Sequence, residues 1–333
     1  MTTHERGTPR NPGRAGHAAT LPTSPRRTGS GPLLMGVINV TPDSFSDGGR
    51  WYSESNAVAH GVQLAAQGAA ILDIGGESTR PGAARPDVEE ELRRTVPVIR
   101  RLTSDAGLGS LRVTVSIDTM RARVAAAAIE AGARVVNDVS GGLADPDMAR
   151  VIAQSADLGV DYVAMHWRGH SDRMQQRAVY DDVVREVGDE LLERVDALAS
   201  AGVDPARIVL DPGLGFAKTA EHNWTLLAHL DRLGALGFRV LVGASRKSFL
   251  GALEAGADGS PAPPERREAA TAAITLLCAQ AGVWCVRVHD VQMSRSVLRV
   301  ADAVARHGGQ PGQPGQPGRP GRAGSAHTSG ERT

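Results

Sequence analysis

Short apolar runs recur along the central part of the chain, and each is flanked by glycine or polar residues. They are rich in β-branched residues. Brief, continuously apolar runs of this kind are typical of strands that are buried on both faces of a parallel sheet. The pattern therefore predicts eight parallel strands, at 33–38, 70–74, 112–117, 133–137, 161–165, 207–210, 239–243 and 284–288.

Helical periodicity fills the intervals between these runs. The clearest helices are predicted at 120–131, 181–201, 265–281 and 292–306. Gly132 and Gly202 follow the first two, and a glycine just past the last turn is a common helix end. Strands that alternate evenly with helices over this length predict the α/β class and a single (β/α)8 TIM barrel. The alternative is an open doubly wound sheet, but no G-x-G-x-x-G follows the first strand to favour it.

The two ends of the chain differ in composition from the centre. Residues 1–30 are rich in Pro, Gly, Arg, Ser and Thr, and 308–333 contain the repeat "GQPGQPGQPGRPGRAG". Neither segment can bury enough apolar surface to offset the entropy lost on ordering. We predict two disordered tails around one barrel domain, 31–307, that has no internal linker.

Composition excludes several classes of function. The chain has 37 basic and 37 acidic residues and no net charge, which gives no support to binding of nucleic acid or a membrane surface through overall charge. We see no secretory signal and no apolar run long enough to span a membrane. Cys278 and Cys285 lie in apolar patterns and are predicted to be packed free thiols. These features predict a cytoplasmic protein.

The predicted strands share polar ends. The second ends in "GGESTRPG" (75–82), the sixth in "DPGLGFAKT" (211–219) and the eighth in "RVHD" (287–290), and the other five end in similar clusters. In a TIM barrel the carboxyl ends of the strands form the active-site face. The sequence therefore predicts one ring-shaped site at the mouth of the barrel.

Seven segments carry a resemblance to a known family. They are "MGVINVTPDSFSDGG", "DIGGESTRPG", "SIDT", "VVNDVSGG", "LDPGLGFAKTAEHN", "LVGASRKSFLG" and "VRVHDV". In this order they resemble the dihydropteroate synthases, from about Leu33 to about Val304, most closely the actinobacterial members. The resemblance implies condensation of 6-hydroxymethyl-7,8-dihydropterin diphosphate with 4-aminobenzoate in folate biosynthesis. It also implies dependence on Mg2+, a homodimer, and competition by sulfonamides.

A pterin edge needs a buried carboxylate, an amide and a cation in one plane. Asp211 can accept two bonds from the amino and ring N–H groups, and Asn137 can both donate and accept. Lys247 can donate to the keto oxygen, and Asp118 adds a second carboxylate. The resemblance assigns all four to pterin binding. The alternative is that Asp118 and Asp211 merely cap the helices after their strands.

The leaving diphosphate needs cations and N–H donors. Arg287 and His289 alternate along the predicted eighth strand, so both point to one face. Arg287 can bind a phosphate through two N–H groups, and His289 can donate to the leaving oxygen. By resemblance these two residues bind the diphosphate, and Asn39 offers one oxygen to Mg2+.

A third subsite is implied for 4-aminobenzoate. "SRKS" is predicted to open a helix with Ser248 in its first turn, where N–H groups favour a carboxylate. Phe216 can pack on the benzene ring, and Lys247 lies beside Ser248. By resemblance, Phe45 and Asp47 of one loop close over the bound substrates.

The loop that follows the second strand adds Thr79 and Arg80, which the resemblance assigns to the diphosphate. Glu77 is expected to cap a helix or to brace this loop, and it is assigned no chemistry. His166, Trp167 and Arg168 receive no role, and His166 is expected to be structural.

Two other functions compete with this interpretation. A methyltetrahydrofolate:corrinoid methyltransferase shares the pterin groups at its strand ends, but it has no reason to carry "SRKS", "TPDSFSDGG" or "RVHD". A non-catalytic paralogue of the synthase would be expected to lose its loop motifs first, and here they are intact. The chain shows no nucleophile elbow, Ser–His pair or reactive cysteine motif, which fits a reaction that needs no strong protein nucleophile.

Overall fold

The computed structural model of the protein describes residues 31–41, 54–77, 85–104, 108–109, 111–169 and 174–308. The tails that we predicted to be disordered lie outside these residues, apart from Gly308, where the last helix ends. The predicted barrel domain and the described part of the chain therefore cover nearly the same residues.

Eight parallel strands close into a barrel in sequence order, with β1 paired to both β2 and β8. The strands are β1 (Leu33–Asn39), β2 (Ile71–Gly75), β3 (Thr114–Asp118), β4 (Val135–Asp138), β5 (Asp161–Met165), β6 (Ile208–Asp211), β7 (Arg239–Val242) and β8 (Cys285–Val288). All eight predicted strands are confirmed. Because the sheet is closed, the alternative of an open doubly wound sheet is wrong.

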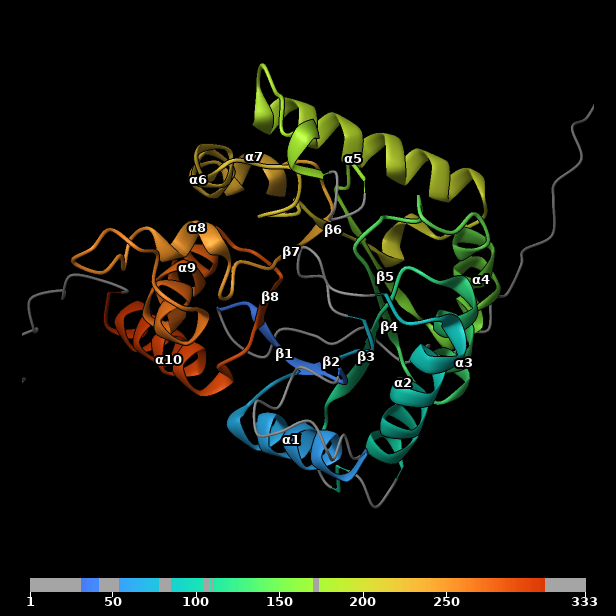
Figure 1. Cartoon of the computed structure of the whole chain (residues 1–333). Helices are drawn as coiled ribbons and strands as arrows, with labels where there is room; N and C mark the ends of the chain where they lie inside the picture. Colours follow the sequence, from blue (N-terminus) through green and yellow to red (C-terminus); the bar gives the residue numbers. More distant parts are fainter. Residues whose placement is uncertain are drawn as a thin grey trace, which may run out of the picture.

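The helices form a ring outside the strands (Figure 1). They are α1 (Glu54–Gln67), α2 (Val88–Thr103), α3 (Ala122–Glu130), α4 (Met148–Gln154), α5 (Val183–Ser200), α6 (Ala220–Ala228), α7 (Leu230–Gly234), α8 (Ser248–Gly251), α9 (Glu268–Gln280) and α10 (Val291–Gly308). The four helices predicted by range correspond to α3, α5, α9 and α10. The predicted start of α9 is a separate 3-10 turn, Pro264–Arg267.

Alternation along the strands divides the apolar residues into two cores. One set of side chains, which includes Met35, Val163 and Leu241, packs in a cluster of its own, separate from the larger cluster that the strands share with the helices. Leu72, Ile117 and other intervening residues belong to the larger cluster. Successive strand residues point to opposite faces, so the smaller cluster fills the inside of the barrel.

A buried ion pair closes the end of the barrel away from the site. Asp161, at the start of β5, is fully buried and accepts two hydrogen bonds of 2.9 Å from Arg239 at the start of β7. The Arg239 guanidinium stacks on Trp284, 4.9 Å from the ring centroid. Since the amino-terminal face of a TIM barrel serves stability, we assign these residues to folding.

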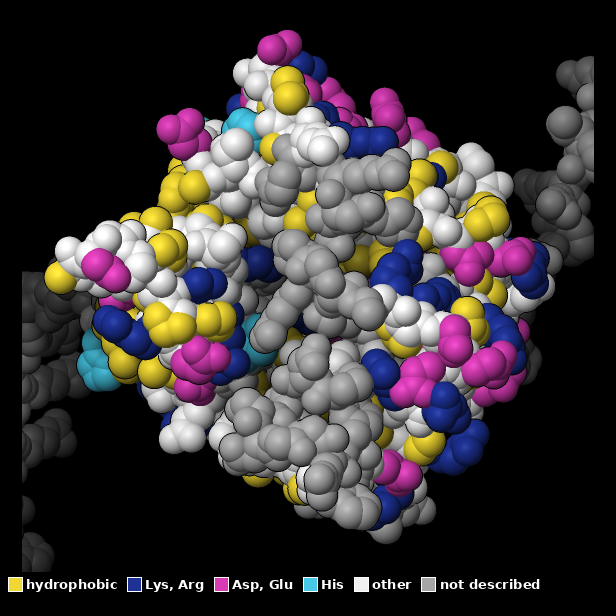
Figure 2. All heavy atoms as spheres, in the orientation of Figure 1, with side chains coloured by type: hydrophobic (Ala, Val, Ile, Leu, Met, Phe, Trp, Pro, Cys, Tyr) yellow, Lys and Arg dark blue, Asp and Glu magenta, His cyan; other side chains and the backbone are white. Residues whose placement is uncertain are grey.

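Three further observations bear on the compartment and the surface. Cys278 and Cys285 are free and buried, as the sequence predicted. Within the described residues, no helix has the length and apolar character needed to cross a membrane. Basic and acidic side chains are intermingled over α2 and α3 (Figure 2).

Candidate active site

Strand register brings the predicted residues together at the mouth of the barrel. Asn39 pairs with Gly75, Gly75 with Asp118, and Asp118 with Asn137, so three predicted residues lie at one level on neighbouring strands. Asp211 ends β6, opposite Met165 of β5. The ring of polar strand ends inferred from the sequence is therefore present.

Asp73 organises the floor of this site, and the sequence analysis gave it no role. Its carboxylate is fully buried. It accepts hydrogen bonds from Ser116 Oγ (2.6 Å), Asn137 Nδ2 (2.9 Å) and Arg287 Nε (2.6 Å). Because one amide hydrogen of Asn137 is held here, the orientation of that amide is fixed before any ligand arrives.

Arg287 joins the two subsites that the sequence analysis treated as separate. Besides its bond to Asp73, it donates from Nη2 to Asp118 Oδ2 at 2.7 Å. Burial raises the pKa of Asp118 and Arg287 opposes that rise. Phosphate binding by Arg287 must therefore use the N–H groups that remain on the guanidinium. The same side chain also sets the position of a predicted pterin carboxylate.

Asp211 and Asp118 do not cap helices. Asp211 Oδ1 accepts from the backbone N–H of Gly213 at 2.7 Å, well before α6, whose N-cap is Thr219. The N-cap of α3, Arg121, makes no side-chain cap bond, and the N–H of Ala122 is bound by Asp145. The capping alternative is therefore wrong. The pKa of Asp211 is raised, because the effect of burial exceeds the lowering by the hydrogen bond from Gly213 and by the nearby lysines.

Lys247 and Phe216 lie against each other. The Lys247 ammonium is 4.0 Å from the centroid of the Phe216 ring, a cation–π contact between the loops after β7 and β6. Burial lowers the pKa of Lys247 to about 8, although Asp211 opposes this shift. Phe216 is half-buried, so part of the residue remains accessible.

Ser248 is the exposed first residue of α8, as predicted, but that helix has only four residues. A single turn carries little of the dipole that a longer helix would offer a carboxylate. Arg246 ahead of it has left-handed backbone, with φ at 60°. Arg246 pairs with Glu268, and its carbonyl accepts from Arg267 at 2.8 Å. These contacts from the start of α9 hold the strained turn.

His289 is paired with Ser245, a contact that the sequence analysis did not foresee. Ser245 Oγ lies 2.9 Å from His289 Nδ1 and accepts from the backbone N–H of His289 at 3.2 Å. When the hydroxyl donates to Nδ1, the ring proton sits on Nε2, which is the tautomer that a donor to the leaving oxygen requires. The described structure therefore contains a Ser–His pair, but the serine is buried and orients the ring.

Four predicted residues, Phe45, Asp47, Thr79 and Arg80, lie outside the described residues. Glu77, just before one of these segments, pairs with Arg85 at 2.6 Å and Arg121 at 3.2 Å. It therefore braces the residues on both sides of the segment 78–84, as predicted for Glu77.

Few side chains among the described residues are grouped so that they could bind a metal ion. In that part of the chain, no group of three or more His, Cys, Asp and Glu side chains could hold a metal ion. Asn39 offers a single amide oxygen at the end of β1. Mg2+ commonly keeps several waters and binds through one or two protein oxygens plus substrate phosphates. These residues therefore suit a metal ion that binds together with a diphosphate. They do not suit an ion held by protein ligands alone.

The fold and the site define a barrel whose mouth gathers buried carboxylates, an amide and a guanidinium from neighbouring strands. A family model described as "Pterin binding enzyme" matches residues 35–289. A dihydropteroate synthase of Mycobacterium leprae (strain TN) is 54% identical over 278 residues, which are 83% of this chain and 95% of that protein. The chain belongs to the pterin-binding enzyme family, and within it to the dihydropteroate synthases.

Solved structures agree with this membership. Xanthomonas albilineans dihydropteroate synthase with 4-aminobenzoic acid matches with a TM-score of 0.73 and 46% identity, over 83% of this chain and 93% of that one. The Xanthomonas albilineans enzyme in complex with 7,8-dihydropteroate matches with a TM-score of 0.70 and 44% identity, over 83% and 94%. The predicted activity is confirmed at this level. The protein is a transferase of folate biosynthesis that joins 6-hydroxymethyl-7,8-dihydropterin diphosphate and 4-aminobenzoate into 7,8-dihydropteroate, releasing diphosphate.

Proposed function

We propose that the described residues divide this reaction among three adjoining subsites. Asp211, Asn137, Asp118 and Lys247 bind the pterin, Arg287 and His289 bind the diphosphate, and Phe216, Ser248 and Lys247 bind 4-aminobenzoate. One observation carries the proposal. Hydrogen bonds between side chains of four strands hold hydrogen-bond donors and acceptors, and charges of both signs, in fixed positions at the mouth of the barrel. The residues are Asp73, Asn137, Asp118 and Arg287. Phe45, Asp47, Thr79 and Arg80 keep the roles that the family resemblance implies.

The reaction needs little from the protein as a nucleophile. The C–O bond from the pterin methylene to the diphosphate breaks, and its electron pair stays on the leaving oxygen. The amine of 4-aminobenzoate forms the new C–N bond and gives up one proton, which the released diphosphate can accept. The dihydropterin ring delocalises positive charge at the methylene, so charge on the leaving group is what the site must stabilise. Arg287 and His289 are placed for this, and the network of hydrogen bonds around Asp73 supplies positioning.

Pterin binding is expected to weaken as the pH rises through about 8. Lys247 must be protonated to donate to the keto oxygen, and burial holds its pKa at about 8 in the free protein. Above that pH the charged fraction falls about tenfold per unit. Calorimetric titration of bare pterin from about pH 7 to about pH 9.5 measures the decline. Lys247→Met should bind more weakly at every pH and lose the step near 8. A step of full size in that variant would assign the titration to another group.

Ser245→Ala is expected to lower kcat by about tenfold while bare pterin affinity stays within about twofold of wild type. Without the hydroxyl, the His289 ring loses its hydrogen bond with Ser245 Oγ and is held less firmly in the orientation that reaches the leaving oxygen. Ser296→Ala, which removes an exposed hydroxyl on α10, is the matched control. Equal kcat values for the Ser245 variant and wild type would mean that Ser245 does not orient the ring.

The Mg2+ in this proposal would be held by Asn39, the diphosphate oxygens and water. When bound, the ion would neutralise charge on the leaving group. Asn39 is half-buried at the end of β1, the strand that adjoins β8 and its Arg287. Asn39 would therefore present its oxygen beside the two diphosphate residues.

Sulfonamides are proposed to compete for the third subsite because they imitate 4-aminobenzoate. Their arene would take the place beside Phe216, and their sulfonyl group the place of the carboxylate near Ser248. Inhibition that 4-aminobenzoate relieves and pterin diphosphate does not relieve would support this location.

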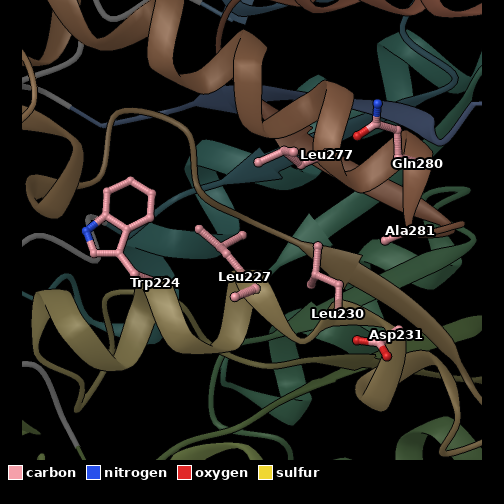
Figure 3. Close-up of a pocket in the computed structure, with 8 residues that line it drawn as sticks. Trp224, Leu227, Leu230, Asp231, Leu277, Gln280 and Ala281 are labelled. Atoms are coloured by element: carbon pink, nitrogen blue, oxygen red, sulfur yellow. The ribbon is translucent and has the colours of Figure 1, made fainter.

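We also propose that the enzyme is a homodimer formed through the face made by α6, α7, α9 and α10. A groove of about 380 Å3 lies between α6 and α9, lined by Trp224, Leu227, Leu230 and Leu277 (Figure 3). Leu277 is half exposed, and on the neighbouring α10 the side chains of Val300 and Val304 are about two-thirds exposed. Apolar surface of this kind marks interaction sites, and a second copy can seat its own α9 or α10 there.

Leu277→Arg is expected to convert the dimer to a monomer in sedimentation equilibrium. The charge would lie in the groove, where a partner subunit would have to bury it at a cost of several kcal/mol, on the order of that for an unpaired buried ion. Leu158→Arg, on the short turn before β5, places the same charge on a similarly exposed leucine and should leave the dimer intact. A monomeric wild type, or a dimeric Leu277 variant, would contradict the interface.

A cytoplasmic location is proposed on two grounds. Both cysteines are free thiols, and burial raises the pKa of each, which keeps them unreactive. A reducing compartment suits a protein whose cysteines pack as apolar residues.

Diphosphate release from the purified protein tests the whole proposal. Mg2+, pterin diphosphate and 4-aminobenzoate are each omitted in turn, and a sulfonamide is added to the complete mixture. Release that needs all three and is blocked by the sulfonamide supports the assignment. Tight pterin binding without release that depends on aminobenzoate would favour the non-catalytic paralogue.

A further inference from the structure

A chain of buried polar groups lies behind the 4-aminobenzoate subsite and takes no part in the reaction described above. Lys218, in the loop after β6, is almost fully buried. Its ammonium lies 2.9 Å from His166 Nδ1 and donates to the carbonyl of Phe216 at 3.1 Å. His166 Nε2 lies 2.9 Å from Glu190 Oε2 on α5.

The chemistry of the partners gives the direction of the hydrogen bonds. The ionised Glu190 can only accept, so His166 Nε2 carries the ring proton and donates to Glu190, and Nδ1 accepts from the Lys218 side chain. Burial and the Lys218 charge lower the pKa of His166 to about 4, so the ring is neutral. Burial raises the pKa of Glu190, but the hydrogen bonds from His166 and Arg168 have the larger effect and lower that pKa to about 2. Burial lowers the pKa of Lys218 to about 7, and Asp211 opposes this shift. The chain therefore runs from a lysine that is cationic below about pH 7, through a neutral ring, to an anion.

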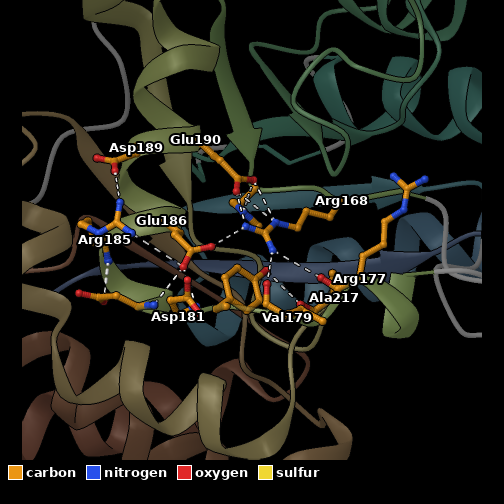
Figure 4. Close-up of polar contacts among 12 residues, drawn as sticks. Arg168, Arg177, Val179, Asp181, Arg185, Glu186, Asp189, Glu190 and Ala217 are labelled. Atoms are coloured by element: carbon orange, nitrogen blue, oxygen red, sulfur yellow. Dashed lines mark hydrogen bonds and ion pairs between the residues drawn. The ribbon is translucent and has the colours of Figure 1, made fainter.

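A second chain reaches the same loop from Arg168 (Figure 4). Arg168 donates to Glu190 and Glu186, and to the carbonyl of Val179 at 2.7 Å. Its guanidinium stacks on the Tyr180 ring, 3.9 Å from the centroid. The Tyr180 hydroxyl then donates to the carbonyl of Ala217 at 3.0 Å. The carbonyls of Phe216 and Ala217 are thus each held by a side chain, from Lys218 and Tyr180 respectively, that is itself fixed by a hydrogen-bonded network.

The loop needs such support because its backbone is strained. Ala217 has φ at 47°, in the left-handed region that a non-glycine residue rarely adopts. Strained residues persist only where the surrounding structure holds them. The preceding residue is Phe216, whose ring contacts Lys247. The conformation at Ala217 therefore sets where the Phe216 ring stands.

We propose that Lys218 and Tyr180 are positioning residues that hold the Phe216–Ala217 turn and thereby set the affinity of the enzyme for 4-aminobenzoate. His166, Glu190 and Arg168 anchor them. The inference rests on the proposed place of Phe216 beside the 4-aminobenzoate ring. It gives a function to His166 and Arg168, which the sequence analysis left without one.

Two variants test the proposal by steady-state kinetics. Tyr180→Phe removes one hydroxyl and changes no charge at neutral pH. It is expected to raise KM for 4-aminobenzoate about threefold while KM for pterin diphosphate stays within about twofold. Lys218→Met should raise KM for 4-aminobenzoate by about tenfold. Because Lys218 also attracts Asp211, this variant is expected to raise KM for the pterin substrate by a smaller factor. Arg150→Met, which removes an exposed charge from α4 that pairs with Asp147, should change neither.

A double-mutant cycle with Phe216→Ala separates positioning from general destabilisation. If Lys218 acts through the Phe216 ring, adding Lys218→Met to Phe216→Ala should raise KM for 4-aminobenzoate by less than about twofold. A full effect in that background, or equal rises in both KM values for Tyr180→Phe, would overturn the proposal. The wild type separates the two levels of failure. If the wild type shows no aminobenzoate-dependent release of diphosphate, the proposed function is wrong. If the wild type turns over normally but the Lys218 and Phe216 substitutions show no coupling in the double-mutant cycle, only this inference is wrong.

Discussion

Asp211→Ala is expected to abolish measurable binding of bare pterin in isothermal titration calorimetry. The Asp211 carboxylate is the charged acceptor for the amino and ring N–H groups, and two charge-assisted bonds together are worth about 3 kcal/mol or more. That is a loss of at least about 100-fold. The effect is increased because the Asp211 charge opposes the lowering of the Lys247 and Lys218 pKa values that burial causes. The variant leaves both buried cations closer to losing their protons.

Two further variants make this result specific. Asp211→Asn keeps an oxygen for the Gly213 N–H and removes the charge, so its affinity should fall between those of wild type and Asp211→Ala. Asp189→Ala removes an exposed carboxylate on α5 that pairs with Arg185 and should bind like wild type. Affinity of Asp211→Ala within a few-fold of wild type would mean that the pterin edge is read elsewhere.

The fold was predictable because each strand carries its own signal. A barrel strand is buried on both faces, so it appears as a short apolar run that ends in polar residues, and no distant information is needed to see it. The weakest boundary was the start of α9, which was predicted at 265, three residues early, in a 3-10 turn that starts at Pro264. Sequence periodicity does not distinguish one turn of 3-10 helix from the first turn of an α-helix.

The site was only partly predictable, because its decisive contacts join residues far apart in the chain. Asp73 lies within a run that otherwise appears apolar, and only closure of the barrel brings it to Arg287. A signal was present, since Asp73 stands two residues after Ile71, on the inward face of β2. A charge at an inward position of a buried strand requires partners, and Ser116, Asn137 and Arg287 supply them.

Lys218 and Ser245 were missed for a related reason. Each lies beside a residue chosen for its chemistry, Phe216 and Lys247 respectively, and each acts on a histidine from another strand end. Motif matching assigns chemistry to residues that face the ligand. The residues that orient them become visible only when the geometry of the neighbouring strands is known.

Arg287→Met is expected to reduce both stability and turnover by large factors. It removes the cation that faces Asp73, which is fully buried, and Asp118, whose side chain is 11% exposed. Breaking a buried pair and leaving its partner unpaired costs about 3–5 kcal/mol. Loss of the guanidinium from the leaving group should lower kcat by about 100-fold or more. From the sequence alone, bare pterin binding would stay intact. The bond to Asp118 leads us to expect a smaller loss of that affinity too.

The stability loss should depend on pH with a definite sign. Burial raises the pKa of Asp118 and Arg287 opposes that rise. Without Arg287 the folded pKa of Asp118 therefore lies further above its unfolded value, and folding favours its protonated form. The deficit relative to wild type is then smallest at about pH 5, where Asp118 is protonated in both folded proteins, and grows as the pH rises through about 7, where the wild-type carboxylate ionises. Urea unfolding at about pH 5 and about pH 8 measures the difference. An equal deficit at both values would show that the Asp118 carboxylate is not the cause.

A second substitution separates the two effects of Arg287. Asp73→Asn removes the unpaired charge, and its amide can still bond with Ser116 and Asn137. Arg287→Met with Asp73→Asn should therefore regain a large part of the lost stability, because the two sites are in contact and their effects are not additive. Turnover should stay low, since no cation returns to the leaving diphosphate. Recovery of turnover together with stability would assign Arg287 to folding alone, and the leaving charge would then be stabilised by other groups.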